Sequence, residues 1–260
     1  PRSSSAASDV YKRQPMWGYL YKKVLDGLDD SHRYIIPDLI GFGFSEKVSI
    51  NEHSLEAHSM WMAKFFSTIE EEKIGLVVHD WGGMIGIAGA MKAGKKIDGL
   101  VVMNTAITAP KDGFKPTWFH SLSQVPLISS FLFRGLNFPL SFLNRFASVP
   151  GSFDSETMKA YKYPLRKFKN NCGPLALARM VPNSMHHPSV PLEQEIETYL
   201  GSYDGPAQIV WGMNDPVMWK LRRRTSRLLP QAKVVKTQAG HFVQEETPEE
   251  VITAIKEIFK

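Results

Sequence analysis

One stretch, residues 74–83, restricts the fold more than any other part of the chain. Its apolar run Leu76-Val77-Val78 stops at the polar pair His79-Asp80, and two glycines follow the next residue. A pattern of small and apolar residues then continues to about residue 91 with the spacing of a helix. We therefore predict a strand, a sharp turn and a helix, in which the glycines let helix and strand approach closely.

Strand and helix patterns alternate over much of the rest of the chain. Alternation of this kind predicts an α/β fold with a mostly parallel sheet and helices on both faces. In the first long helix, Trp61, Phe65 and Ile69 recur every four residues, which predicts one buried face. The predicted strands are 34–36, 74–78, 99–103, 208–211 and 233–236, and the predicted helices are 54–71, 84–91, 221–229 and 248–259.

The chain divides into three parts by composition. Residues 1–14 are serine-rich without periodicity and are typical of a non-native leader, so we leave them out of the fold and expect part of the natural amino-terminal sheet to be missing. Residues 107–194 are rich in proline and phenylalanine, with short helical patterns and no strand pattern. We predict a helical cap over the site for 107–194 and an α/β core for 15–106 and 195–260.

Charge and cysteine content exclude several classes of partner. The net charge is +5, and the basic residues between 220 and 227 have no interleaved aromatic residues, so we expect no nucleic-acid partner. Cys172 is the only cysteine, which excludes an intrachain disulfide and a multi-cysteine zinc site. No apolar stretch is long enough to span a membrane, and no signal peptide is visible. We expect a cytoplasmic monomer or weak oligomer with no metal, cofactor or membrane contact.

Three polar residues, Asp80, Asp215 and His241, each come just after a predicted strand. The carboxyl ends of parallel strands meet at one edge of a sheet, where active sites form. Taken singly, Asp80 could cap the next helix, Asp215 could form a turn before Pro216, and His241 could be structural. Together, their order along the chain is that of nucleophile, acid and base in a catalytic triad. A carboxylate nucleophile suits alkyl transfer, because it forms an ester with the attacked carbon.

Five segments of the chain form a pattern that is shared with a known family. They are His79-Asp80-Trp81-Gly82-Gly83, Trp211-Gly212-Met213-Asn214-Asp215-Pro216, Ala239-Gly240-His241-Phe242-Val243-Gln244-Glu245, Met180-Val181-Pro182 and Pro15-Met16-Trp17-Gly18-Tyr19-Leu20-Tyr21. These segments resemble the haloalkane dehalogenases, a family of α/β-hydrolases. The resemblance covers about Pro15 to Lys260 and implies the α/β-hydrolase fold with an inserted helical cap.

The resemblance implies a mechanism and a set of site residues. Asp80 would displace halide from a small apolar haloalkane, and His241, oriented by Asp215, would activate the water that hydrolyses the resulting ester. Trp81 would hold the halide with its indole N–H, and Trp118 is the candidate for a second halide donor. Many relatives instead have an asparagine in a His-Gly-Asn-Pro segment, where this chain has Gln14.

Three other functions fit parts of the sequence. An epoxide hydrolase shares the aspartate nucleophile but needs acidic hydroxyls, and the spacing of Tyr161 and Tyr163 places them on different sides of a helix. A β-lactone decarboxylase or hydrolase is a closer rival, and an inactive truncated homologue is the third. One branch of the dehalogenases places a glutamate acid where this chain has Asn104, which favours Asp215 as the acid. Four apolar residues could either line a substrate pocket or pack in the core, namely Phe131, Phe133, Phe138 and Leu143.

Overall fold

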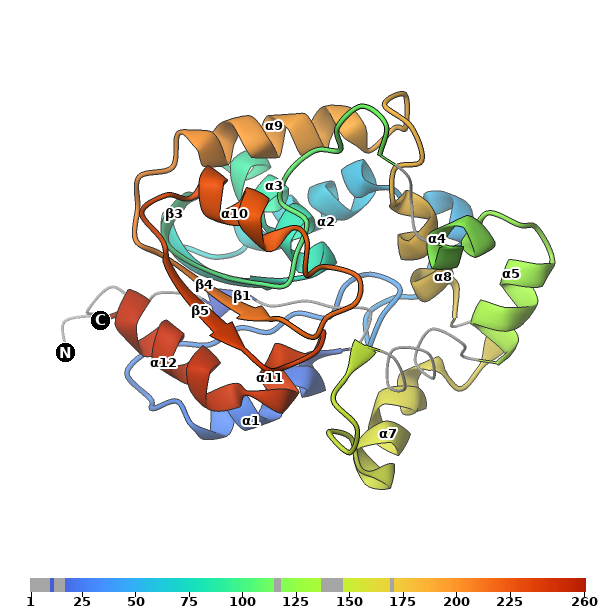
Figure 1. Cartoon of the computed structure of the whole chain (residues 1–260), viewed down its shortest axis with the longest axis horizontal. Helices are drawn as coiled ribbons and strands as arrows, with labels where there is room; N and C mark the ends of the chain where they lie inside the picture. Colours follow the sequence, from blue (N-terminus) through green and yellow to red (C-terminus); the bar gives the residue numbers. More distant parts are fainter. Residues whose placement is uncertain (1–9, 12–16, 115–117, 137–146, 169–170) are drawn as a thin grey trace.

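The computed structural model describes residues 10–11, 17–114, 118–136, 147–168 and 171–260 (Figure 1). At its centre is a five-stranded sheet in which the strands lie side by side in chain order. Each neighbouring pair is parallel, which confirms the predicted fold class. The strands are β1 (Val10–Tyr11), β2 (Lys73–His79), β3 (Lys96–Met103), β4 (Ala207–Gly212) and β5 (Lys233–Thr237).

Helices cover both faces of this sheet (Figure 1). Strand β2 shows why, since Leu76 and Val78 pack on one apolar cluster and Val77 packs on another. Side chains alternate along a strand, so a run of apolar residues buries both faces. On the first face lie α2 (Leu55–Ser67), α3 (Trp81–Lys92), α9 (Val190–Gly201) and α10 (Arg222–Leu228), and on the second η1 (Gly18–Tyr21), α1 (Lys22–Asp26), α11 (Val243–Glu246) and α12 (Pro248–Ile258).

The buried face of helix α2 agrees with the predicted one in part. Ile69, just after the helix, is buried, whereas Trp61 and Phe65 are only partly buried. The apolar stripe of the helix is centred one position further along the chain, on Met62 and Phe66, which are buried. The stripe packs on α3, where a side chain on Gly89 would come within 2.4 Å of Met62.

Two segments near the amino terminus differ from the predicted strands. Residues 34–36 form no strand and contribute a single bridge at Tyr34. These residues are only partly buried, and Pro37, which has no amide hydrogen for a ladder, follows them. Instead, β1 pairs with Gly75 and Leu76 of β2, although it lies within residues 1–14, which we had left out of the fold.

The segment 107–194, called the insert below, contains no strand among its described residues. In Figure 1 its helices α4, α5, α7 and α8 gather at one end of the molecule, whereas α9 runs past residue 194 and lies over the sheet. No helix in the described residues is long and apolar enough to cross a membrane. Besides α9, the insert holds α4 (Trp118–Ser123), α5 (Ile128–Ser130), the π-helical turn η3 (Phe131–Gly135), α7 (Ser155–Lys162), η5 (Tyr163–Leu165) and α8 (Cys172–Met180); η2 (Ile50–Glu52) precedes α2.

The phenylalanines considered for a pocket lining have different surroundings. Phe133 is buried against Leu175 and Ala178 and belongs to a small core of the insert. Phe131 is 62% exposed. Phe138 and Leu143 lie outside the described residues. Core packing is therefore the role that the structure gives to Phe133.

Candidate active site

Asp80 lies in the sharp turn between β2 and α3. Its backbone has φ 46° and ψ −128°, a combination that residues other than glycine rarely adopt. Backbone hydrogen bonds hold this turn, because the Asp80 N–H donates to the Asn104 carbonyl at 3.1 Å and the Gly83 N–H donates to the Asp80 carbonyl at 3.0 Å. The Asp80 side chain makes no capping hydrogen bond to α3, so a role as a helix cap does not account for its presence.

Gly83 shows how tightly the turn packs against the end of β3. A side chain at this position would stand 2.1 Å from Thr105 Oγ1 and 2.9 Å from Ile107 Cγ2. The Thr105 hydroxyl in turn donates to the Asp80 carbonyl. The close approach predicted from the glycines is therefore required at Gly83, and it presses the start of α3 against the residues that follow β3.

His241 and Asp215 form a buried pair beside this turn. Their side chains come from the loops after β5 and β4, and His241 Nδ1 lies 2.7 Å from Asp215 Oδ2. The other carboxylate oxygen, Oδ1, accepts the backbone N–H groups of Val217 at 2.8 Å and Met218 at 3.0 Å. Asp215 thus forms the turn proposed for it and also orients His241, so the two interpretations of this residue do not exclude each other.

Asn104 connects the pair to the sheet. Its Nδ2 donates to Asp215 Oδ2 at 2.8 Å and to the Gly212 carbonyl at 3.0 Å. Its Oδ1 accepts the Gly212 N–H at 2.8 Å. The residue is fully buried and has φ 22°, in the left-handed region that asparagine tolerates better than most residues. Sequence reasoning identified Asn104 only as a position where relatives place an acid, and did not find this role.

The charges of the pair stabilise one another. Burial alone would raise the pKa of Asp215, but the charge and hydrogen bond of His241 and the hydrogen bond from Asn104 lower it to about 2. Burial alone would lower the pKa of His241, but Asp215, with smaller contributions from Asp80 and Glu246, raises it to about 9. The pair is therefore an ion pair at neutral pH while Asp80 carries its charge.

The carboxyl group of Asp80 interacts electrostatically with this pair. Burial raises the pKa of Asp80, and the charge of His241 and the Trp81 backbone N–H oppose that rise. The buried ring of His79 lies 4.9 Å from the His241 ring, and burial holds the pKa of His79 well below its usual value. A neutral His79 therefore adds no second positive charge next to His241.

The loop that carries His241 is fixed to the insert. The His241 N–H donates to the Ala147 carbonyl at 2.5 Å. Glu246 Oε2 accepts the N–H of Gly240 at 2.8 Å and that of Val149 at 3.1 Å. Sequence reasoning missed Glu246, because its hydrogen bond with Val149 joins segments that are far apart along the chain. One carboxylate thus joins the histidine loop to residues 147–149.

The predicted halide donors differ in their surroundings. Trp81 is the first residue of α3, half-buried and packed against the core cluster on that face of the sheet. Trp118, the first residue of α4, is 61% exposed, unlike a donor in a dry cavity. Gln14, at the position of the alternative asparagine, lies outside the described residues. Trp81 directly follows Asp80, and its backbone N–H interacts with the Asp80 carboxyl group.

The two tyrosines considered as epoxide donors have other contacts. Tyr161 is buried, and its hydroxyl donates to Glu245, a residue that also forms an ion pair with Lys23 at 3.0 Å. Tyr163 is 52% exposed, and the Arg166 guanidinium lies 4.0 Å from its ring centroid. The structure therefore does not bring the two hydroxyls together at the triad.

Comparison with known proteins places this chain in a family. A model described as alpha/beta hydrolase fold matches residues 15–248. The chain belongs to this α/β-hydrolase family. Haloalkane dehalogenase 1 of Mycobacterium tuberculosis is 29% identical over 244 residues, which cover 92% of this chain and 78% of that protein. The cis-3-alkyl-4-alkyloxetan-2-one decarboxylase of Xanthomonas campestris is 29% identical over 254 residues, which cover 93% of this chain and 84% of that protein.

Solved structures support the same placement of this α/β-hydrolase. The haloalkane dehalogenase DatA from Agrobacterium tumefaciens has a TM-score of 0.85 at 20% identity, covering 98% of this chain and 89% of that chain. The tetrameric haloalkane dehalogenase DpaA from Paraglaciecola agarilytica has a TM-score of 0.80 at 21% identity, and the match covers 99% of this chain and 86% of that chain. The predicted fold and the resemblance to haloalkane dehalogenases are confirmed.

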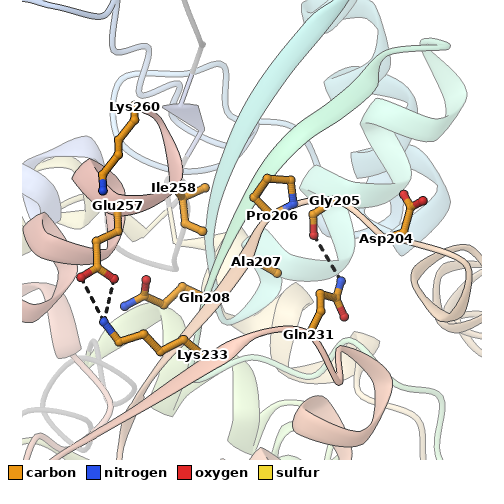
Figure 2. A pocket seen from close by; sticks show the side chains of 10 residues that line it. All are labelled: Asp204, Gly205, Pro206, Ala207, Gln208, Gln231, Lys233, Glu257, Ile258 and Lys260. Atoms are coloured by element: carbon orange, nitrogen blue, oxygen red, sulfur yellow. Dashed lines mark hydrogen bonds and ion pairs between the residues drawn. The ribbon is translucent and has the colours of Figure 1, made fainter.

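A surface depression of this hydrolase lies at the other end of the sheet. Figure 2 shows its lining, which includes Ala207 and Lys233, the first residues of β4 and β5, whereas Asp215 and His241 follow the last residues of these strands. Two polar contacts lie within its lining, since Lys233 pairs with Glu257 at 2.7 Å and Gln231 donates to the Gly205 carbonyl at 3.3 Å. We assign no chemistry to it. The described residues also contain no cluster of His, Cys, Asp or Glu that could hold a metal ion.

Proposed function

We propose that this α/β-hydrolase cleaves the carbon–halogen bond of a small apolar haloalkane with water, giving an alcohol, a halide ion and a proton. The observation that carries the proposal is a carboxylate, Asp80, at a strained turn beside the buried pair of His241 and Asp215. In the first step a carboxylate oxygen of Asp80 attacks the carbon, the carbon–halogen bond breaks, and an alkyl ester forms. Halide leaves as an anion, so this step needs no general acid.

The second step hydrolyses the ester and depends on His241. While Asp80 is charged, it helps to raise the pKa of His241. Ester formation removes that charge, which lowers the pKa of His241 and favours the neutral imidazole when a base is needed. Because Nδ1 faces Asp215, Nε2 would take a proton from water, and the hydroxide would attack the ester carbonyl. Asp215 would stabilise the imidazolium formed in this step.

Backbone and indole N–H groups would stabilise the negative charges of both steps. The N–H of the residue after the nucleophile, here Trp81, is the position from which α/β-hydrolases donate to an oxyanion. The Trp81 indole is our candidate for a halide donor in the first step. Trp118 is a weaker candidate in the described structure, because its exposed side chain would have to move into a water-free site.

A second candidate is decarboxylation or hydrolysis of a β-lactone. It is favoured by one observation, the 29% identity to an oxetanone decarboxylase, which equals the identity to a dehalogenase. The Asp80 carboxylate could attack the ring carbon that bears the ring oxygen and break that carbon–oxygen bond, which gives an alkyl ester on Asp80 and a free substrate carboxylate. Loss of carbon dioxide from this carboxylate would then break the ester carbon–oxygen bond, release Asp80 and leave an alkene. Epoxide opening is not favoured, because Tyr161 and Tyr163 are held in other contacts.

Parallel assays with four substrates distinguish these functions. The protein and its Asp80→Ala variant are incubated with 1-bromobutane, 1,2-dibromoethane, a cis-3-alkyl-4-alkyloxetan-2-one and an aryl epoxide. We expect the protein to release bromide and acid from the bromoalkanes, the Asp80→Ala variant to release neither, and no diol to form from the epoxide. Alkene and carbon dioxide from the lactone without bromide release would select the decarboxylase. Diol alone would select the epoxide hydrolase, and no turnover of any substrate would identify an inactive homologue.

A further inference from the structure

Positive charge is concentrated in the insert. Residues 107–194 contain ten Lys and Arg but only four Asp and Glu, so the insert carries +6. The whole chain carries +5, which leaves −1 for all other residues together. The charge of this protein is therefore a property of the insert and not of the α/β core.

Exposed apolar side chains are concentrated in the same segment. Thirteen large apolar side chains are exposed among the described residues, and ten of them lie in the insert. Single exposed apolar residues are common on any surface, but a concentration in one segment marks a contact surface. The most exposed is Leu127 at 83%, which lies between α4 and α5 at φ 61°, an unusual backbone angle for a leucine.

Charged and apolar residues of two segments of the insert lie near one another. The Arg134 guanidinium lies 4.2 Å from the ring centroid of Phe168, and the Asn171 side chain donates to the Arg134 carbonyl at 2.9 Å. These contacts join η3 to the segment that follows η5. We call the exposed residues of these two neighbouring segments the insert rim, namely Leu127, Phe131, Lys162, Arg166, Lys167 and Phe168. In Figure 1, α5, which adjoins Leu127 and Phe131, and α7, which ends at Lys162, lie with the other helices of the insert at one end of the molecule.

We propose that the insert rim binds peripherally to an anionic lipid surface. Lysine and arginine side chains would pair with lipid phosphates, while Leu127, Phe131 and Phe168 would enter the boundary between headgroups and acyl chains. Contact of this kind needs no membrane-spanning helix. It revises the expectation of no membrane contact, which considered only the length of apolar stretches and the run of basic residues at 220–227.

Charge and side-chain type disfavour two other occupants of the rim. Two copies of this chain would bring two positively charged inserts together, and their repulsion opposes self-association through the rim. Nucleic acid would also neutralise the lysines and arginines, but its bases stack on flat aromatic rings and make no use of an aliphatic tip such as Leu127. A lipid surface accounts for the cations and the aliphatic side chains together.

Vesicle flotation with charge-matched variants tests the proposal. The full chain is mixed with vesicles of phosphatidylcholine alone or with one third phosphatidylglycerol. The rim variant replaces Lys162, Arg166 and Lys167 by glutamine. The control replaces Lys220, Arg223 and Arg227, which are exposed in and next to α10 and outside the insert. Each variant has a net charge of +2. Thermal melting verifies that both variants are folded.

We expect the chain to float only with the anionic vesicles and to be released by high salt. The rim variant should bind on the order of a hundredfold more weakly, while the control variant should retain most of its affinity. A Leu127→Ser, Phe131→Ser variant should lose affinity at unchanged net charge. Absence of vesicle binding, equal losses in both charge variants, rim-dependent binding of duplex DNA without vesicle binding, or rim-dependent self-association in sedimentation would each overturn the proposal.

Discussion

Replacing Asn104 by alanine should separate the two chemical steps and weaken the fold. The change removes three hydrogen bonds and leaves the Gly212 N–H, the Gly212 carbonyl and an Asp215 oxygen with one partner fewer. Each buried polar group that loses a partner costs about 1–3 kcal/mol. Because water can enter the vacated space, we take the lower end and expect a loss of about 3 kcal/mol in the free energy of unfolding, measured by urea titration.

The kinetic effect should fall on ester hydrolysis alone. Alkylation of Asp80 does not use His241, so a burst of bromide near one per enzyme molecule should keep its rate. Hydrolysis needs the pair of Asp215 and His241, and loss of a hydrogen bond to the charged Asp215 should slow it roughly ten- to a hundredfold. Rapid-quench measurement of bromide with 1,2-dibromoethane resolves the burst from steady turnover.

A second buried asparagine provides the control for this experiment. The Asn171 side chain donates to the Arg134 carbonyl at 2.9 Å within the insert. Asn171→Ala should therefore destabilise the protein by about 1 kcal/mol without slowing hydrolysis. Our reasoning about Asn104 would be refuted by a variant with normal steady turnover, or by one in which the burst slows as much as the turnover does.

Three further predictions follow from the site. The pKa of His241 rises in the fold from 6.5 to about 9, so its stabilising contribution is complete below pH 6.5 and is lost as pH rises towards 9. The melting temperatures of the protein and of His241→Gln, plotted against pH, should therefore converge between pH 6.5 and 9. A constant difference between them would contradict the raised pKa of His241. Gly83→Ala should abolish activity, because its Cβ would meet Thr105 at 2.1 Å, whereas Gly86→Ala, whose nearest contact is 3.6 Å away, should be tolerated; equal melting temperatures and activities would refute this. Glu246→Gln removes a charge that raises the pKa of His241. Because hydrolysis needs neutral His241, the acidic limb of its pH–rate profile should shift to lower pH, and an unshifted limb would count against that coupling.

Much of the fold could be predicted because local and tertiary signals agree there. The strand ending at His79, the glycines after Trp81 and the helix to Lys92 are specified by residues that are neighbours in sequence. The positions of Asp80, Asp215 and His241 follow from the rule that parallel strands bring their carboxyl ends to one edge. The failures were at 34–36, where only Tyr34 forms a bridge, and at Trp61 and Phe65 of α2, which are only partly buried.

Contacts between distant segments could not be predicted from the sequence. Asn104 and Asp215 are far apart along the chain, and nothing local shows that the amide of one reaches the carboxylate of the other. Glu246 holds residues of the insert, and Tyr161 contacts Glu245 of α11, through the same kind of long-range packing. The concentration of charge in the insert was present in the sequence, but its meaning depended on which apolar side chains the fold leaves exposed.

Trapping the covalent intermediate tests the central claim most directly. His241→Phe removes the base but leaves Asp80, so incubation with 1-bromobutane should release one bromide per protein molecule and stop. Intact-protein mass spectrometry should then show one added butyl group, and peptide mapping should place it on Asp80. Bromide release without an adduct, or a butyl group on any residue other than Asp80, would contradict the account.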